Sequence, residues 1–175
     1  ALGGLQRLYP KIGAWDAMSA VLEQQRELAT DEEQELSIDL QLAEIHRHHF
    51  GDIEVALDYY RTVLDRRSGH AGAIRALEEL MEAGEGAFEA SLILEVEYEA
   101  SHAWENLANL QRIQMPFLDS SEERLDLVQR SAGLLESELG DFVGAVGVYA
   151  EALANGLPLA LMQGAAEDVA ERGQV

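Results

Sequence analysis

One segment of this chain recurs, and the recurrence restricts the folds that the chain can adopt. Residues 50–60 read FGDIEVALDYY and residues 139–149 read LGDFVGAVGVY, which keeps Gly-Asp, Ala and the final Tyr in the same places. Aligning Trp15 with Trp104 gives an offset of 89 residues, and this register holds without a gap for about fifty residues. Repetition on this scale indicates an array of stacked structural repeats. We interpret the two tryptophans as wedges between helices rather than as ligand platforms.

The recurring segment has the pattern of a tight corner between two helices. Gly51 and Gly140 suit the left-handed residue that ends a helix, and the Asp after each glycine suits the N-cap of the next helix. Beyond the first corner, apolar residues recur at three- and four-residue spacing, as in a helix with one buried face; they are Ile53, Ala56, Leu57, Tyr60, Val63 and Leu64. Because the turn is only one or two residues long, the two helices should fold back antiparallel.

Capping patterns mark further helix starts. Asp31 and Gln34 form a capping-box pattern, and at the equivalent place in the second copy stand Ser120 and Glu123. The sequence Asn-Gly-Leu-Pro at 155–158 ends one helix and places a proline in the first turn of another.

Pro116 predicts a difference between the two copies. It cannot lie inside a helix without kinking it, so the helix that carries Trp104 should end near Met115, whereas the equivalent helix runs on to Ala29. We therefore expect no strands and helices at about 1–10, 14–29, 32–50, 53–66, 70–83, 87–100, 103–115, 121–139, 142–155 and 158–172.

Small residues inside the helices indicate close contacts. We expect Ala56 and Ala145 to be buried at helix crossings, where little more than a methyl group fits. Gly144 and Gly147 lie one turn apart inside a predicted helix, and each should cost about 1 kcal/mol in helix propensity. We interpret both glycines as positions where a neighbouring helix approaches closely.

The positions described so far resemble the tetratricopeptide repeat (TPR), a family of helical hairpins. The matching residues are Leu42, Ala43, His46, Gly51, Asp52, Ala56, Tyr60, Val63 and Leu64. The chain departs from the family in one extra residue before the glycine, in His46 or Leu135 at an aromatic position, and in Ser68 at an expected proline. With these departures it resembles the longer, divergent arrays of large bacterial scaffold proteins.

The resemblance implies a fold and a domain organisation. The fold is an all-α, right-handed α-solenoid of about ten antiparallel helices, and residues 1–175 form a single helical-repeat domain. Its clearest repeats are at about 32–69 and 121–157. Because the first residue is Ala, we expect the chain to be a segment of a longer protein.

The charge of the chain bears on its partners. Acidic residues outnumber basic residues by 33 to 12, which gives a formal net charge of −21. Such a surface repels phosphate backbones and anionic lipid head groups, so we expect neither nucleic acid nor membrane as a partner. The absence of cysteine removes disulfides and thiolate metal sites from consideration but does not decide the compartment. We expect a soluble protein and favour the cytoplasm over the periplasm.

The resemblance also implies a function, that of a protein–protein interaction scaffold that holds a peptide or helix of a partner in its concave groove. The groove positions of the family fall on Ser37, Leu40, Glu44, Arg47, Asp126, Gln129, Gly133 and Glu136. The net charge favours a protein partner with a basic or amphipathic segment. Self-association stays open, and one alternative is a structural spacer whose groove binds nothing.

We identify no active site and predict that the protein is not an enzyme and has no cofactor. Carboxylate pairs such as 32–33 and 122–123 are common in so acidic a chain, and no Ser, His or Lys stands at a spacing that completes a catalytic group. His46, His48 and His49 raise a second alternative, a metal- or small-ligand-binding helical protein. We favour packing for His46 and a helix C-terminus for the other two, where the helix dipole favours positive charge.

Overall fold

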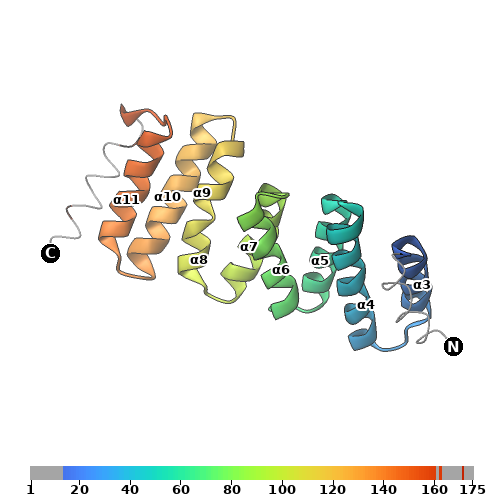
Figure 1. The fold of residues 1–175 in the computed structure, drawn as a ribbon. Coiled ribbons are helices and arrows are strands. Elements are labelled where there is room, and N and C mark those ends of the chain that lie inside the picture. The colour runs from blue at the N-terminus through green and yellow to red at the C-terminus, as the bar shows by residue number, and fades with distance from the viewer. Residues whose placement is uncertain (1–13, 161, 163–170, 172–175) are drawn as a thin grey trace. The chain divides into compact units, whose positions relative to one another are not determined.

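The computed structural model describes residues 14–160 together with 162 and 171, and every regular element in that part of the chain is a helix (Figure 1). The all-α expectation is confirmed for these residues. The helix expected at 1–10 and most of the one expected at 158–172 lie outside them. The chain divides into two compact units, residues 1–93 and 94–175, and the boundary falls inside helix α7 (Ala87–Ala100). None of the described helices is long and apolar enough to cross a membrane.

The helix ends lie close to the predicted positions. The first unit contains α3 (Trp15–Leu28), α4 (Glu32–Ile45), a π-helical turn η1 (His46–Phe50), α5 (Ile53–Arg66) and α6 (Ala71–Ala83). The second unit contains α8 (Trp104–Asn109), α9 (Gln111–Gln114), a 3₁₀ turn η2 (Met115–Phe117), α10 (Ser121–Ser137) and α11 (Phe142–Ala154). The helical stretch that begins at Trp104 therefore ends around Pro116, as its sequence predicts, whereas α3 is one continuous helix.

The Gly-Asp corner has the same construction in both copies. Gly51 and Gly140 have φ values of 68° and 63°, the left-handed region that favours glycine. The aspartate after each glycine caps the next helix by accepting a hydrogen bond from the amide three residues further on, at 3.3 Å in the first copy and 2.8 Å in the second. The predicted helix ends and N-caps are confirmed at both corners.

The extra residue that precedes each glycine widens the last turn of the helix. The amide of Asp52 donates to the carbonyl of His46 at 3.0 Å, and the amide of Asp141 donates to that of Leu135 at 2.8 Å. Each bond spans one residue more than the longest bond of a Schellman helix end. In the first copy the wider turn is the π-helix η1, a single turn of the kind in which π-helices mostly occur.

The two predicted capping boxes differ in the structure. Ser120 and Glu123 form the complete box, because the Ser120 hydroxyl accepts from the Glu123 amide at 3.0 Å and the Glu123 carboxylate accepts from the Ser120 amide at 3.3 Å. Asp31 instead accepts from the amide of Glu33 at 3.4 Å, so a shorter cap replaces the predicted pairing with Gln34.

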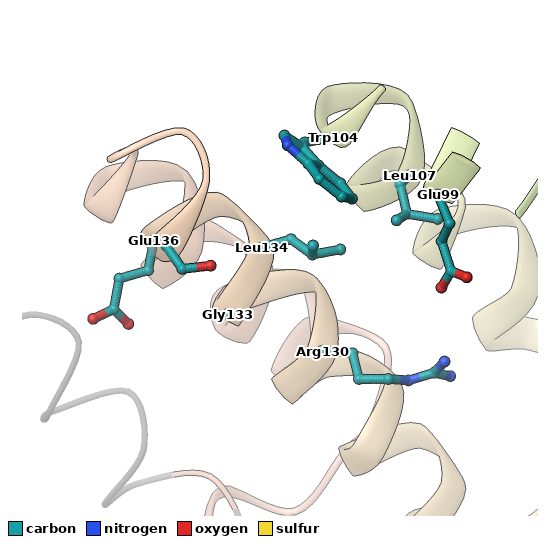
Figure 2. Close-up of a pocket in the computed structure, with 8 residues that line it drawn as sticks. Glu99, Trp104, Leu107, Arg130, Gly133, Leu134 and Glu136 are labelled. Atoms are coloured by element: carbon teal, nitrogen blue, oxygen red, sulfur yellow. The ribbon is translucent and has the colours of Figure 1, made fainter. Parts of the chain in front are cut away.

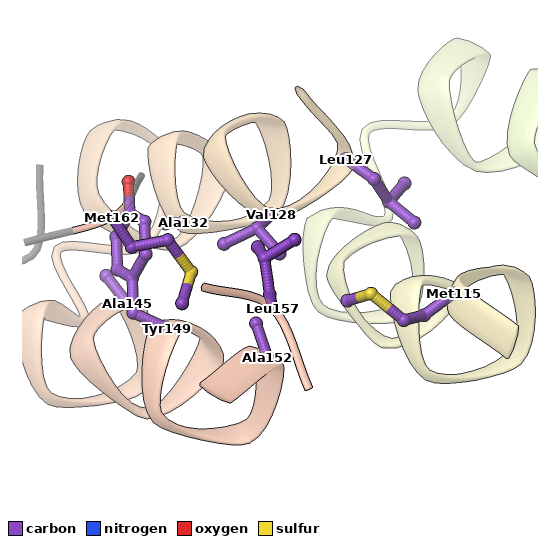
Figure 3. Packing of buried hydrophobic residues seen from close by; sticks show 9 residues of the cluster. All are labelled: Met115, Leu127, Val128, Ala132, Ala145, Tyr149, Ala152, Leu157 and Met162. Atoms are coloured by element: carbon purple, nitrogen blue, oxygen red, sulfur yellow. The ribbon is translucent and has the colours of Figure 1, made fainter. Parts of the chain in front are cut away.

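Each unit has an apolar core between its helices. In the first unit, α3 and α4 bury Met18, Leu22, Ile38, Leu42 and Ile45, with Trp15 and Tyr59 packed against them. The core of the second unit is the cluster in Figure 3: Met115, Leu127, Val128, Ala132, Ala145, Tyr149, Ala152, Leu157 and Met162. Ala56 and Ala145 are fully buried, which confirms the prediction for both alanines.

The interpretation of Gly144 and Gly147 as contacts with a neighbouring helix is wrong. A Cβ added at Gly147 would meet no atom within 4 Å, because this face of α11 is exposed. A Cβ added at Gly144 would collide with the carboxylate of Asp141, the residue that caps the same helix. The glycine at 144 therefore makes room for a close cap, and the glycine at 147 has no packing role that the structure shows.

One buried ion pair distinguishes the first unit from the second. Asp39 of α4 is completely buried, and its carboxylate contacts the guanidinium of Arg26 from α3. Burial raises the pKa of the Asp39 carboxyl, and the nearby Arg26 offsets this only in part. At the 89-residue offset these two positions are Met115 and Val128, both in the apolar core of the second unit.

Candidate functional site

The groove positions predicted on α4 are largely occupied by contacts within the protein. The hydroxyl of the buried Tyr60 donates to the Glu44 carboxylate at 2.8 Å. Arg47 donates to Glu79 of α6 at 3.0 Å, and its side chain is only 9% exposed. Burial, followed by the hydrogen bond to Glu44, raises the pKa of Tyr60, so the phenol stays protonated.

The other two predicted positions on α4 differ from each other. Ser37 is exposed, and its backbone carbonyl accepts a hydrogen bond from the side-chain amide of Gln41 at 3.0 Å. Leu40 is half-buried and lies near Gly72, at the start of α6. On this side of the first unit, Leu40 and Arg47 contact α6, while Ser37 and Glu44 are exposed.

The groove positions predicted on α10 lie beside open space instead. Asp126 and Gln129 border a shallow depression together with Arg130. Gly133 and Glu136 line a cavity of about 670 Å³ between α10 and the segment from the end of α7 to α8. The structure thus brings two of the four positions into one hollow and places the other two next to it along the same helix.

We call this hollow the α8–α10 cavity; its lining residues are Glu99, Trp104, Leu107, Arg130, Gly133, Leu134, Glu136 and Ser137 (Figure 2). Leu134 and Leu107 extend into the space from opposite sides, and the indole of Trp104 lies at one end. Gly133 leaves the wall of α10 open, because an added Cβ there would meet no atom within 4 Å. The volume falls within the range of about 300 to 1,000 Å³ that is usual for ligand pockets.

Charged groups border the apolar centre of the cavity. Arg130 lies at the far end from Trp104 in Figure 2 and donates to Glu95 at 3.2 Å. Glu95 also accepts from the side chain of Gln114 at 2.8 Å, so this corner forms a small polar network. Glu99 lies beside Leu107, and Glu136 carries its carboxylate on the outer side of α10.

Sequence reasoning missed the cavity as a whole. The prediction treated Trp104 as a core wedge, but the ring is half-buried at the cavity's edge. The sequence signal for the cavity is in the alignment of the two copies, in which Gly133 is aligned with Glu44 and Ser137 with His48. Two small residues one turn apart on α10 line open space, whereas the equivalent positions on α4 and η1 carry larger side chains.

The three neighbouring histidines have separate partners. His46 is half-buried, with its ring against those of Phe50 (centroids 5.1 Å apart) and Tyr59 (5.8 Å). His48 lies 3.1 Å from the Glu44 carboxylate. The His49 ring stacks on the indole of Trp15, at 3.4 Å and an interplanar angle of 7°.

The positions of these histidines bear on the alternative of a metal-binding protein. No group of three or more His, Cys, Asp or Glu side chains suited to a metal ion occurs in the described part of the chain. The acidic pairs at 32–33 and 122–123 lie exposed in the first turns of α4 and α10, where the helix dipole favours negative charge.

Comparisons of this chain with protein-family models, with curated proteins and with solved structures find no match.

Proposed function

We propose that this chain is a protein-interaction module, a TPR-like right-handed α-solenoid that binds a basic or amphipathic segment of a partner protein and carries out no catalysis. The observation that carries the proposal is the α8–α10 cavity, an apolar hollow that includes two of the predicted groove positions, Gly133 and Glu136. Asp126 and Gln129 extend the same exposed face by two turns of α10.

The chemistry of this face suits a peptide better than a small polar metabolite. The centre of the cavity is formed by Trp104, Leu107 and Leu134, which offer apolar contact and few hydrogen-bonding groups. Peptide-binding surfaces depend on such apolar anchor points, and polar groups around them set the register. A net charge of −21 attracts cationic segments over several ångströms before contact is made.

A spacer that binds nothing remains the second candidate, and the first unit supplies the observation that favours it. Glu44 of α4 and Arg47 of η1, two predicted binding residues, are bonded to Tyr60 and Glu79. If α10 behaved in the same way, the array would serve only to set the distance between other parts of a protein.

Charge reversal on α10 tests the proposal. We expect a partner captured by the chain to be lost when Asp126→Lys and Glu136→Lys are combined. Glu44 is unsuitable for this purpose, because its reversal would leave the buried Tyr60 hydroxyl without its acceptor. The matched control is Asp65→Lys with Glu82→Lys, two exposed positions near helix C-termini where the added cations are favourable.

The salt dependence of the kinetics provides a second readout on the same partner. Association should slow steeply as salt rises from about 0.05 to 0.5 M, because long-range attraction is screened, while dissociation should change much less. A partner that binds the α10 double variant as well as the unaltered chain would refute the proposal for this face. Failure to capture any partner at low salt would favour the spacer.

A further inference from the structure

The two copies of the repeat differ in the side chains that surround the tryptophan, and this difference indicates which group would fit the α8–α10 cavity. In the first unit the tryptophan of the repeat, Trp15, is covered by the ring of His49 in a parallel stack at 3.4 Å. In the second unit the equivalent indole is Trp104, which meets the ring of His102 edge-on, at 4.9 Å and an interplanar angle of 61°. The residue aligned with His49 is Glu138, so no ring from this position stacks in parallel on the indole.

The neighbouring positions follow the same contrast. Glu44 of α4 and His48 of η1 lie 3.1 Å apart in the first unit. Their counterparts are Gly133 and Ser137, and both line the α8–α10 cavity. The larger side chains of Glu44 and His48 in the first unit thus correspond to a glycine and a serine that line open space in the second.

We infer that the α8–α10 cavity receives one aromatic side chain of a partner protein, flanked in the partner's sequence by lysine or arginine. This inference rests on the proposed function and specifies the anchor of the bound segment. A ring placed against Trp104 would take the role that His49 plays in the first unit. Offset or parallel contact between rings, together with burial of their apolar faces, makes aromatic side chains frequent anchors at interfaces.

The remaining lining agrees with an aromatic anchor. Leu107 and Leu134 face the space from opposite helices, so a flat apolar group would contact both (Figure 2). Gly133 lets the backbone of α10 approach the face of an inserted ring, since no side chain stands between them.

The charges specify the flanking residues. Glu99 borders the cavity beside Leu107, and the single basic lining residue, Arg130, is paired with Glu95. Because the chain carries a net charge of −21, residues that flank the inserted ring lie in a negative potential, which favours cations. Each exposed pair adds little affinity, so the ring supplies the anchor and the cations speed association.

The test uses synthetic peptides, so it does not depend on finding the natural partner. A seven-residue peptide with a central Phe and two lysines on each side, separated from the Phe by single glycines, is compared with the same peptide carrying a central Ala. A third peptide keeps Phe but replaces the lysines by glutamates. Affinity is measured by anisotropy of labelled peptide, and Trp104 emission is followed in the Trp15→Phe chain, where it is the sole tryptophan.

We expect the Phe–Lys peptide to bind at least about tenfold more tightly than the other two and to change the emission of Trp104. Gly133→Leu should abolish this binding by filling the cavity, without loss of thermal stability. Gly147→Leu is the matched control, because it is also a helical glycine at which an added Cβ meets no atom within 4 Å, yet it lies on α11.

Four results would overturn the inference. The first is that the Ala-centred peptide binds as tightly as the Phe–Lys peptide, and the second is that the Phe–Lys peptide binds the Gly133→Leu chain as tightly as the unaltered chain. The third is peptide binding without a change in Trp104 emission. The fourth is a Trp104 emission that depends on protein concentration alone, which would mean that a second copy fills the cavity. If the Phe–Lys peptide binds the Gly133→Leu chain normally but not the Asp126→Lys, Glu136→Lys chain, the inference fails and the interaction module stands.

Discussion

The buried ion pair of the first unit can be replaced by the apolar pair that the second unit already uses. The perturbation is Arg26→Met combined with Asp39→Val, which copies Met115 and Val128 at the 89-residue offset. Because Asp39 is completely buried, its carboxylate has lost its hydration, and a single ionic contact to Arg26 replaces it. We predict that the double variant is as stable as the unaltered chain or more stable, by up to about 4 kcal/mol.

The single variants should behave very differently from each other. Arg26→Met leaves the carboxylate of Asp39 buried without a cation and should cost about 3 to 5 kcal/mol. Asp39→Val leaves Arg26, whose side chain is 37% exposed and can turn toward water, so this variant should lie close to the unaltered chain. Adding Asp39→Val to Arg26→Met should therefore restore the lost stability, which is strong coupling in a double-mutant cycle.

The pH dependence follows from the raised pKa of Asp39. A carboxyl whose pKa is higher in the folded chain than its usual value of about 3.8 favours folding in its protonated form. Its contribution is greatest below that usual value and is lost as the pH rises through the folded pKa. The advantage of the double variant should thus be largest at neutral pH and shrink in acid, and Arg26→Met should regain stability as the pH falls.

The assay must report on the first unit alone, because two compact units need not unfold together. Trp15 lies in α3, so its fluorescence in a Trp104→Phe background follows that unit during denaturation by urea. An Arg26→Met chain as stable as its parent, or a double variant no more stable than Arg26→Met, would refute the reasoning.

Other substitutions test the packing positions. Ala56→Leu should cost about 1 to 3 kcal/mol through overpacking, and an unchanged melting temperature would show that the repeat register is wrong. Gly147→Ala should stabilise the chain by about 0.5 to 1 kcal/mol in a thermal melt, whereas Gly144→Ala should gain less because its methyl group meets the capping carboxylate of Asp141. His46→Tyr should be neutral or mildly stabilising in denaturant unfolding, and lost partner binding with an intact fold would contradict its packing role.

The helices could be predicted because their ends are encoded locally. Asp52 and Ser120 each cap the amide three residues further on, and Pro116 removes a backbone donor at one known position, so each signal is complete within a short window. A glycine at position 51 likewise indicates a left-handed backbone conformation from a single residue. The described helix ends accordingly fall within a few residues of the expected ones.

The cavity and the ion pair could not be predicted in this way, because they depend on which side chains meet across helices. Arg26 and Asp39 belong to different helices, and only their aligned partners Met115 and Val128 mark the place as buried. The sequence around Gly51 does not show which carbonyl accepts from the Gly51 amide. In the structure it is the carbonyl of His46, five residues back, which makes the last turn π-helical.

The contrast between the two copies has an energetic side as well. The first unit adds paired polar groups to its apolar core, such as the hydrogen bond from Tyr60 to Glu44, and removing one partner of such a pair is costly. In the second unit, glycine replaces that acceptor at position 133, and apolar residues hold the core. Polar contacts specify a single arrangement of their partners. An apolar core beside an open cavity keeps its stability when residues that line the cavity are substituted. The second unit is therefore the one in which a binding surface could diverge at little cost to the fold.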